Sequence, residues 1–221
     1  MKESTYIQIT SALHANPALE RSVNMANRLI TNAIYIAYPC LIVWLFIAGG
    51  WPSAILNGDW SAFAVPAVSG SATAELAGES TSAAVSGVGL LGFANAQAAT
   101  PIEGHIALLY ALLVPGISFV LVSVFRRIVN APRPYEVFDG VPVIAKDTLG
   151  KSFPSRHAFS IFIIGMAFCA CCPLAWAGPV ILMLGVALAA IRVIAGVHFP
   201  RDVIAGALAG ILLGYVGFWL I

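Results

Sequence analysis

The sequence predicts an all-α membrane protein, a polytopic bundle of about five transmembrane helices preceded by an N-terminal amphipathic interfacial helix. Of its 221 residues, 60% are hydrophobic and 10% are charged, and the mean hydropathy is +0.91. Soluble domains carry roughly 25% charged residues, so this composition excludes an ordinary soluble enzyme, and the high hydrophobicity excludes a disordered chain. The second observation is a series of Leu-, Ile-, Val- and Phe-rich runs, each close to the ~20 residues that a helix needs to cross a bilayer.

The apolar runs follow one another along the chain, with polar segments between them. Before the first run, residues 1–28 alternate apolar side chains such as Tyr6, Ile9 and Leu13 with polar ones, a pattern typical of an interfacial amphipathic segment. Because little more than Pro173 separates the third and fourth runs, we expect a tight helical hairpin there. The predicted spans, with approximate ends, are 29–49, 105–125, 157–172, 175–195 and 203–221.

The stretch between the first two spans differs in composition from the rest of the chain. Residues 61–100 contain 26 Ala, Gly, Ser or Thr residues and no Lys or Arg. This bias predicts a flexible or loosely packed insertion, with a weak additional membrane segment over 83–99 as the alternative. We therefore expect one membrane-embedded domain over 1–221 that carries an insertion at 61–100.

The charges are few but unevenly placed. The formal net charge is only +1, so nothing indicates a nucleic-acid partner, and the expected partner is the lipid bilayer. Eight of the 11 Lys and Arg residues fall between Arg126 and Arg201, and the other three precede the first span. With five spans and short hairpins, all of them would lie on one face of the membrane.

Three polar clusters lie on that face, at the ends of the predicted spans. The first closes the second span and runs from Arg126 to Arg133 and Pro134. The second opens the third span and reads Pro-Ser-Arg-His over residues 154–157. The third joins spans four and five: Arg192, then His198 after five intervening residues, then Asp202 after three more.

These residue types fit a phosphate site. Arg126, Arg133 and Arg192 offer planar forks of donors suited to phosphate oxygens. Ser155 is the expected N-cap of the third span, so the free backbone N–H groups that follow it would point at an anion.

The two histidines add the groups that phosphoryl transfer needs. His198 and Asp202 are four residues apart and can meet across one helical turn. A carboxylate on one ring nitrogen fixes the tautomer and leaves the other nitrogen as a nucleophile. His157 comes from a different helix, so it could act on the opposite side of the phosphorus as a general acid.

The three clusters together resemble the motifs of the type-2 phosphatidic acid phosphatase family, which also includes vanadium haloperoxidases and bacterial acid phosphatases. The family pattern is Lys, six residues, Arg-Pro; then Pro-Ser-Gly-His; then Ser-Arg, five residues, His, three residues, Asp. The order and all spacings within the blocks match, and the resemblance covers about residues 100–221. It identifies 105–221 as the catalytic core.

The resemblance implies an enzyme in which each motif residue has a defined role and which needs no metal or other cofactor. His198 would form a phosphohistidine with the help of Asp202, and His157 would protonate the leaving group. The residues expected to hold phosphate oxygens are Arg126, Arg133, Ser155, Arg156 and Arg192. The substrate would be a phosphorylated membrane lipid, with undecaprenyl diphosphate favoured by similarity to short five-span members, and phosphatidic acid or phosphatidylglycerol phosphate as the alternative.

Three positions depart from the family pattern. Arg126 occupies the position of the family's lysine, Arg156 that of its glycine, and Ile191 that of its serine. Arg156 keeps its backbone N–H but adds a side chain that is either a further cation or an obstruction. None of the departures affects His157, His198 or Asp202.

Other readings of the sequence remain open. The same residues could hold vanadate in a haloperoxidase, although membrane spans serve no purpose in that chemistry, and a non-catalytic transporter or scaffold would tolerate loss of His198. The positive-inside rule puts the cation-rich face in the cytoplasm. Resemblance to bacterial members instead puts the active site on the extracytoplasmic face of the cell membrane, and we favour that side because phosphate binding explains most of the cations.

Overall fold

The computed structural model describes residues 1–58, 104–144 and 148–221, and the regular secondary structure of these residues is helical throughout. The insertion predicted at 61–100, and with it the alternative segment at 83–99, lies outside the described residues. The elements are α1 (Glu3–His14), α2 (Pro17–Ala48), α3 (Trp51–Asn57), α5 (Gly104–Val129), α6 (Pro134–Val137), α7 (Arg156–Cys171), α8 (Ala177–Ile194), α9 (Pro200–Tyr215) and the π-helical turn η3 (Val216–Leu220).

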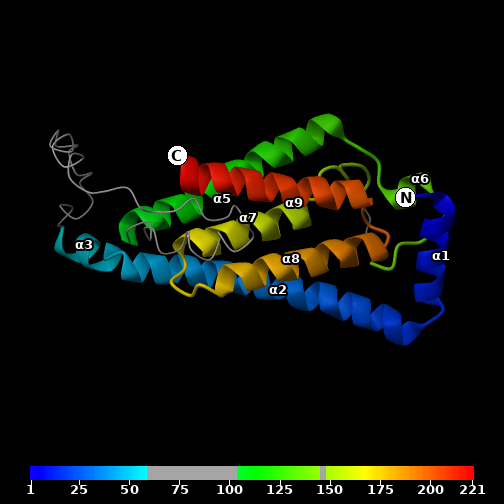
Figure 1. Ribbon diagram of the computed structural model, residues 1–221, viewed down its shortest axis with the longest axis horizontal. Coiled ribbons are helices and arrows are strands. Elements are labelled where there is room, and N and C mark those ends of the chain that lie inside the picture. Colours follow the sequence, from blue (N-terminus) through cyan, green and yellow to red (C-terminus); the bar gives the residue numbers. More distant parts are fainter. Residues whose placement is uncertain (59–103, 145–147) are drawn as a thin grey trace, which may run out of the picture.

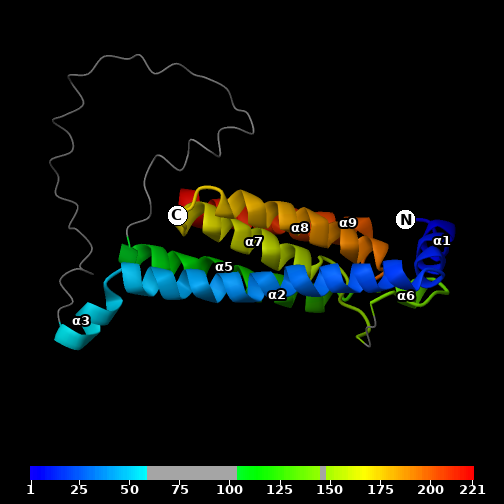
Figure 2. The ribbon, with the colours of Figure 1, turned by 90° about the horizontal axis from the view of Figure 1, so that it is seen from below.

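The long helices run side by side as one elongated bundle (Figures 1 and 2). Four of them, α2, α5, α8 and α9 with its continuation η3, are long and apolar enough to cross a membrane. Their outer faces expose large apolar side chains such as Ile36, Val120 and Leu212. The prediction of a polytopic helical membrane protein is confirmed.

Helix α7, the third predicted span, is shorter than the four membrane-spanning helices, with η3 counted as part of α9, and it is the most enclosed of the bundle helices. It has 16 residues, of which ten are buried, and it packs against α5, α8 and α9. At 1.5 Å per residue it is about 24 Å long, short of the ~30 Å hydrocarbon layer. Because its neighbours cover it, α7 does not have to match the membrane thickness by itself.

Glycines bring α9 very close to α7. A Cβ atom added to Gly206 would lie 2.5 Å from the backbone oxygen of Ser155, and one added to Gly210 would lie 2.8 Å from the backbone oxygen of Phe159. Small residues four apart let helix backbones approach where the lipid gives no hydrophobic drive to association. This contact fixes the start of α7 against the start of α9.

The N-terminal region differs from the prediction in where its first helix ends. The separate crosswise helix, α1, stops at His14, and α2 then continues without a break from Pro17 to Ala48 (Figure 1). The Asn16 side chain accepts hydrogen bonds from the backbone N–H groups of Ala18 and Leu19, and Pro17 occupies the first helical turn. Asn16 and Pro17 therefore start the long helix, and the polar residues up to position 28, predicted to be interfacial, form its first turns.

Candidate active site

The three sequence clusters meet at one end of the bundle, the end where α1 lies crosswise. There α5 and α8 end while α7 and α9 begin (Figures 1 and 2). The predicted residues Arg126, Arg133, Ser155, Arg192, His198 and Asp202 are all buried at this end. Burial of so many polar groups in a small region requires partners or ligands for them.

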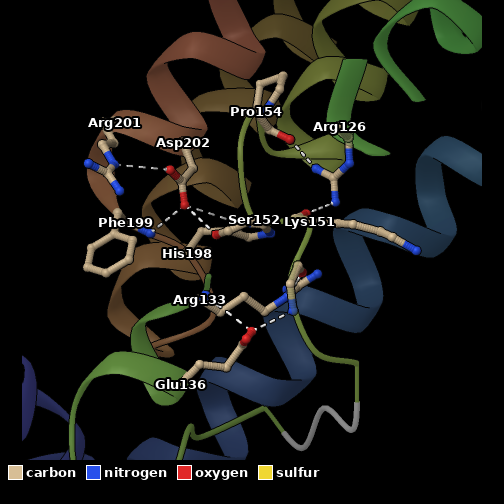
Figure 3. A network of polar contacts seen from close by, with 11 residues as sticks. Arg126, Arg133, Glu136, Lys151, Ser152, Pro154, His198, Phe199, Arg201 and Asp202 are labelled. Carbon is tan, nitrogen blue, oxygen red and sulfur yellow. Dashed lines mark hydrogen bonds and ion pairs between the residues drawn. The ribbon is translucent and has the colours of Figure 1, made fainter. Parts of the chain in front are cut away.

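His198 and Asp202 lie together, but a serine hydroxyl stands between them (Figure 3). The His198 Nδ1 atom is 3.7 Å from Asp202 Oδ2, too long for a hydrogen bond. Ser152 Oγ lies 2.5 Å from that same carboxylate oxygen and 3.3 Å from His198 Nδ1. The predicted contact between His198 and Asp202 is thus bridged by the hydroxyl of Ser152.

Asp202 is also a structural residue of the α9 N-terminus. Its Oδ2 accepts a hydrogen bond from the backbone N–H of Phe199 at 3.1 Å, and its backbone oxygen accepts one from the N–H of Ser155 at 2.7 Å. Arg201 Nε lies 3.6 Å from its second carboxylate oxygen. A carboxylate in the first turn of a helix is favourably placed relative to the helix dipole.

His198 lies in the short connection between α8 and α9 and is 1% exposed. Burial lowers the pKa of His198 to about 4, and this effect outweighs the opposing interaction with Asp202. The imidazole is therefore neutral at neutral pH, which is the form that carries a nucleophilic lone pair.

Arg126 has protein partners of its own. Its two terminal nitrogens donate to the backbone oxygens of Lys151 and Pro154 (Figure 3). These carbonyl groups belong to the loop that leads into α7. Arg126, expected to hold phosphate, thus holds in this structure the loop that carries Ser152 and Ser155.

Glu136 joins the first cluster to the same loop. Its Oε1 accepts from the backbone N–H of Arg133 at 3.1 Å and from that of Gly150 at 2.7 Å, while Arg133 Nε donates to the Gly150 oxygen at 3.0 Å. The loop after α5 and the loop before α7 are therefore cross-linked by polar contacts (Figure 3).

Four buried polar atoms in this region have no hydrogen-bond partner. Three are donors, Arg133 Nη1, Arg192 Nε and Ser155 Oγ, and the fourth is the acceptor Asp202 Oδ1, which lies 3.6 Å from Arg201 Nε. Ser155 occupies the predicted N-cap position of α7, but its side chain makes no capping bond. Unsatisfied buried donors are costly, by about 1–3 kcal/mol each. One unpartnered nitrogen on each of two guanidinium groups and an unpartnered hydroxyl, in the cluster that holds a buried histidine, suit an oxyanion.

Arg156 and His157 are placed differently from the other predicted residues. Arg156 is exposed, and its guanidinium carbon lies 5.8 Å from the centroid of the Phe119 ring, while His157 is half-buried. Both side chains line a cavity of about 530 Å³ bounded by α2, α5 and α7. Apart from Arg156 and His157 the wall is mainly apolar, with Ile34, Leu112 and Ile164 among its residues.

The fold and these contacts define a class of protein: a helical membrane protein with a buried site of arginines and histidine at one end of its bundle. The sequence model of the PAP2 superfamily matches residues 105–221, and the chain belongs to this family.

Two curated relatives share part of the chain. It is 28% identical over 118 residues to the "Bacitracin transport permease protein BcrC" of Bacillus licheniformis, covering 53% of this chain and 57% of that protein. It is 43% identical over 61 residues to the "Putative undecaprenyl-diphosphatase YbjG" of Escherichia coli K12, covering 28% of this chain and 30% of that protein. The matches therefore span between about a third and just over half of these relatives' lengths.

The fold as a whole resembles a known crystal structure. Aquifex aeolicus LpxE superposes with a TM-score of 0.57 at 19% sequence identity, and the match covers 97% of this chain and 92% of that one. This similarity supports the arrangement of the helices, including those that precede residue 105.

Sequence reasoning missed two residues of the site, Ser152 and Glu136. Ser152 lies in the loop before α7, whereas Glu136 lies in the one-turn helix α6 and caps its start by accepting from the backbone N–H of Arg133. The one signal available was their position, since Ser152 lies two residues before Pro154 and Glu136 two after Pro134.

Proposed function

We propose that the protein is an integral-membrane lipid phosphatase that needs no metal and that hydrolyses a lipid phosphate or diphosphate through a phosphohistidine at His198. The observation that carries the proposal is the set of buried, unpartnered donors of Arg133, Ser155 and Arg192 in the cluster of residues that contains His198. Such preorganised donors stabilise the charge that develops on phosphate oxygens during transfer.

In the first step, His198 Nε2 attacks phosphorus. Nδ1 faces Ser152 and Asp202, so Nε2 is the nitrogen with the free lone pair. The P–N bond forms as the bond from phosphorus to the leaving oxygen breaks, and His157 gives that oxygen its proton.

In the second step, water hydrolyses the phosphohistidine. His157, now neutral, accepts a proton from the attacking water, the P–N bond breaks, and inorganic phosphate leaves. His198 returns to its neutral form, so the cycle needs no other reactant.

The cavity supports a lipid as the leaving group. It begins at His157, the proposed general acid, and extends along α7 to Ile164, about 10 Å at 1.5 Å per residue. Its mainly apolar wall suits the first carbons of a hydrocarbon chain, and burial of each CH₂ is worth about 0.8 kcal/mol.

Undecaprenyl diphosphate is the proposed substrate. The name of YbjG supports it, as does Arg156, a further cation at the cavity beside His157, where the lipid-linked phosphate of a diphosphate would lie. Phosphatidic acid and phosphatidylglycerol phosphate are the alternatives. We further propose that the site faces the extracytoplasmic side, against the distribution of Lys and Arg, because phosphate binding accounts for the buried arginines.

A transporter is the second candidate, because the name of BcrC describes a transport permease. The two functions make opposite predictions for His198. A phosphatase cannot turn over without its nucleophile, whereas a permease does not need one.

The test is phosphate release by the purified protein in detergent with EDTA. Undecaprenyl diphosphate, phosphatidic acid and phosphatidylglycerol phosphate are compared, each with wild type, His198→Ala and His14→Ala, a histidine of α1 outside the cluster. We expect EDTA-resistant turnover that is lost only in His198→Ala, with undecaprenyl diphosphate as the best substrate. Turnover that persists in His198→Ala, or a folded wild type inactive on all three lipids, would overturn the proposal.

A further inference from the structure

Ser152 is a buried residue that the motifs do not include. Its exposed fraction is 0%, and its Oγ lies between the carboxylate of Asp202 and the ring of His198 (Figure 3). The two partners are 50 and 46 residues away in the sequence. Only the folded chain brings the three side chains together.

The chemistry of the three groups fixes the direction of both hydrogen bonds. An ionised carboxylate can only accept, so the single hydroxyl proton of Ser152 goes to Asp202 Oδ2, at 2.5 Å. The hydroxyl oxygen then has only lone pairs to offer His198 Nδ1, at 3.3 Å. Nδ1 must therefore carry the proton, which leaves Nε2 unprotonated.

Asp202 cannot do this alone in the observed geometry. Its Oδ2 lies 3.7 Å from Nδ1, beyond hydrogen-bond distance, and already accepts from the backbone N–H of Phe199. The carboxylate supplies the charge, but the serine supplies the contact that orients the ring.

The position of Ser152 is set by the arginine-bearing loops. Its backbone N–H donates to the Ala131 oxygen at 2.9 Å, and Arg126 holds the carbonyl groups of Lys151 and Pro154 on either side of it. The loop that holds Ser152 also carries Ser155, one of the unpartnered donors. Phosphate binding and nucleophile orientation thus depend on one loop.

We propose that Ser152 is a positioning residue that fixes the tautomer and orientation of His198 by linking its Nδ1–H to the carboxylate of Asp202. The inference rests on the proposed function of His198 as nucleophile. When the P–N bond forms at Nε2, the ring becomes positively charged and keeps its Nδ1 proton. Ser152 then accepts a stronger hydrogen bond and transmits the negative charge of Asp202, with no net proton transfer.

The first experiment compares Ser152→Ala with wild type and with Ser123→Ala, which removes a buried hydroxyl of α5 that has no hydrogen-bond partner. Residues that orient metal-bound histidines typically contribute about 10- to 100-fold, and we take the same order of magnitude for a nucleophilic histidine. We expect kcat to fall by that factor in Ser152→Ala with KM within about 2-fold, because Ser152 is fully buried and its Oγ is engaged by Asp202 and His198. Ser152→Cys keeps the volume with weak hydrogen bonding, so an intermediate kcat is expected even if the alanine variant is unstable.

A kcat within 2-fold of wild type in folded Ser152→Ala or Ser152→Cys would overturn the inference, as would a loss expressed only in KM. Orthovanadate, which adds to a nucleophile to form a five-coordinate phosphate analogue, separates this outcome from failure of the proposed lipid substrate. Loss of one hydrogen bond should weaken vanadate binding by about 3- to 10-fold in Ser152→Ala. Equal vanadate affinity in wild type and Ser152→Ala would reject the positioning role, whichever lipid is hydrolysed.

Discussion

The two sides of α7 are built in opposite ways. On the side of α9, glycines allow backbone contact, and Gly206 and Gly210 leave no room for even one more carbon atom. On the side of α2 and α5, the helices leave a cavity of about 530 Å³. The tight side carries Ser155 and Asp202, whereas the open side carries Arg156 and His157. The proposed phosphate-binding residue Ser155 and the cavity proposed to take a hydrocarbon chain thus lie on two faces of one helix.

The largest effect is expected from a substitution that adds side-chain atoms at the close contact between α7 and α9. Gly206→Val would force its Cβ against the backbone oxygen of Ser155, and backbone cannot move aside as a flexible side chain can. We expect a loss of about 3 kcal/mol or more in stability and loss of phosphate release. Thermal unfolding in detergent measures the first effect and the lipid assay the second.

Gly116→Ala on α5 is the matched control, because its added Cβ would meet nothing within 4 Å. It should unfold at or above the wild-type temperature, since alanine gains about 1 kcal/mol over glycine in a helix. Equal stability of Gly206→Val and wild type would show that the α7–α9 contact can relax.

The pH dependence of stability tests how firmly the tight side excludes water from His198. Burial lowers the pKa of His198 in the folded chain to about 4, whereas in the unfolded chain the imidazole has its ordinary pKa near 6.5. Between these two pH values, His198 is protonated in the unfolded chain and neutral in the folded one. The titration of His198 therefore leaves the free energy of unfolding unchanged above about pH 6.5. As the pH falls from about 6.5 to 4, it lowers that free energy by up to about 3 kcal/mol.

His198→Gln, which cannot titrate, isolates this contribution. Between pH 7 and pH 4.5, the unfolding temperature of the wild type should fall by more than that of His198→Gln. Parallel curves for the two proteins would mean that His198 is accessible to water in the folded state.

A substitution that fills part of the cavity between α2, α5 and α7 should have a smaller effect, limited to the KM for long-chain substrates. Leu112→Trp narrows the cavity at a distance from His157, and loss of contact with about two CH₂ groups corresponds to roughly a 10-fold rise in KM for a long-chain lipid phosphate. A short soluble phosphate ester should be unaffected, because it does not reach that depth.

Leu113→Trp provides the control, since Leu113 is 55% exposed and is not part of the cavity wall. If both tryptophan variants change KM for the long-chain lipid equally, the cavity is not where the chain binds.

The sequence predicted the parts of the site that follow helical geometry. His198 and Asp202 come together because they are four residues apart across the start of α9, and Ser155 begins α7 as its motif position implies. The clusters converge because successive spans alternate in direction, which returns the end of α5 and the start of α7 to the same end of the bundle.

What the sequence could not predict depends on loops and on contacts between distant residues. Ser152 and Glu136 are joined to their partners by loop geometry that no periodicity encodes. The start of the first long helix, α2, could not be predicted for a different reason. Polar residues such as Arg21 and Arg28 fit an interfacial segment as well as the first turns of a long helix, and only the capping by Asn16 decides between them.

The crosswise helix α1 connects the N-terminus to the site through a chain of aromatic rings. Tyr6 is 1% exposed and lies 5.5 Å from the Phe138 ring, which in turn lies 5.8 Å from the ring of Phe199, the residue after His198. Met1 borders a small surface hollow together with Phe199, Pro200 and Arg201. A peptide tag joined to Met1 would emerge beside the connection between α8 and α9 that carries His198, whereas the C-terminus lies at the opposite end of the bundle (Figure 1) and is the safer place for a purification handle or a fluorescent reporter.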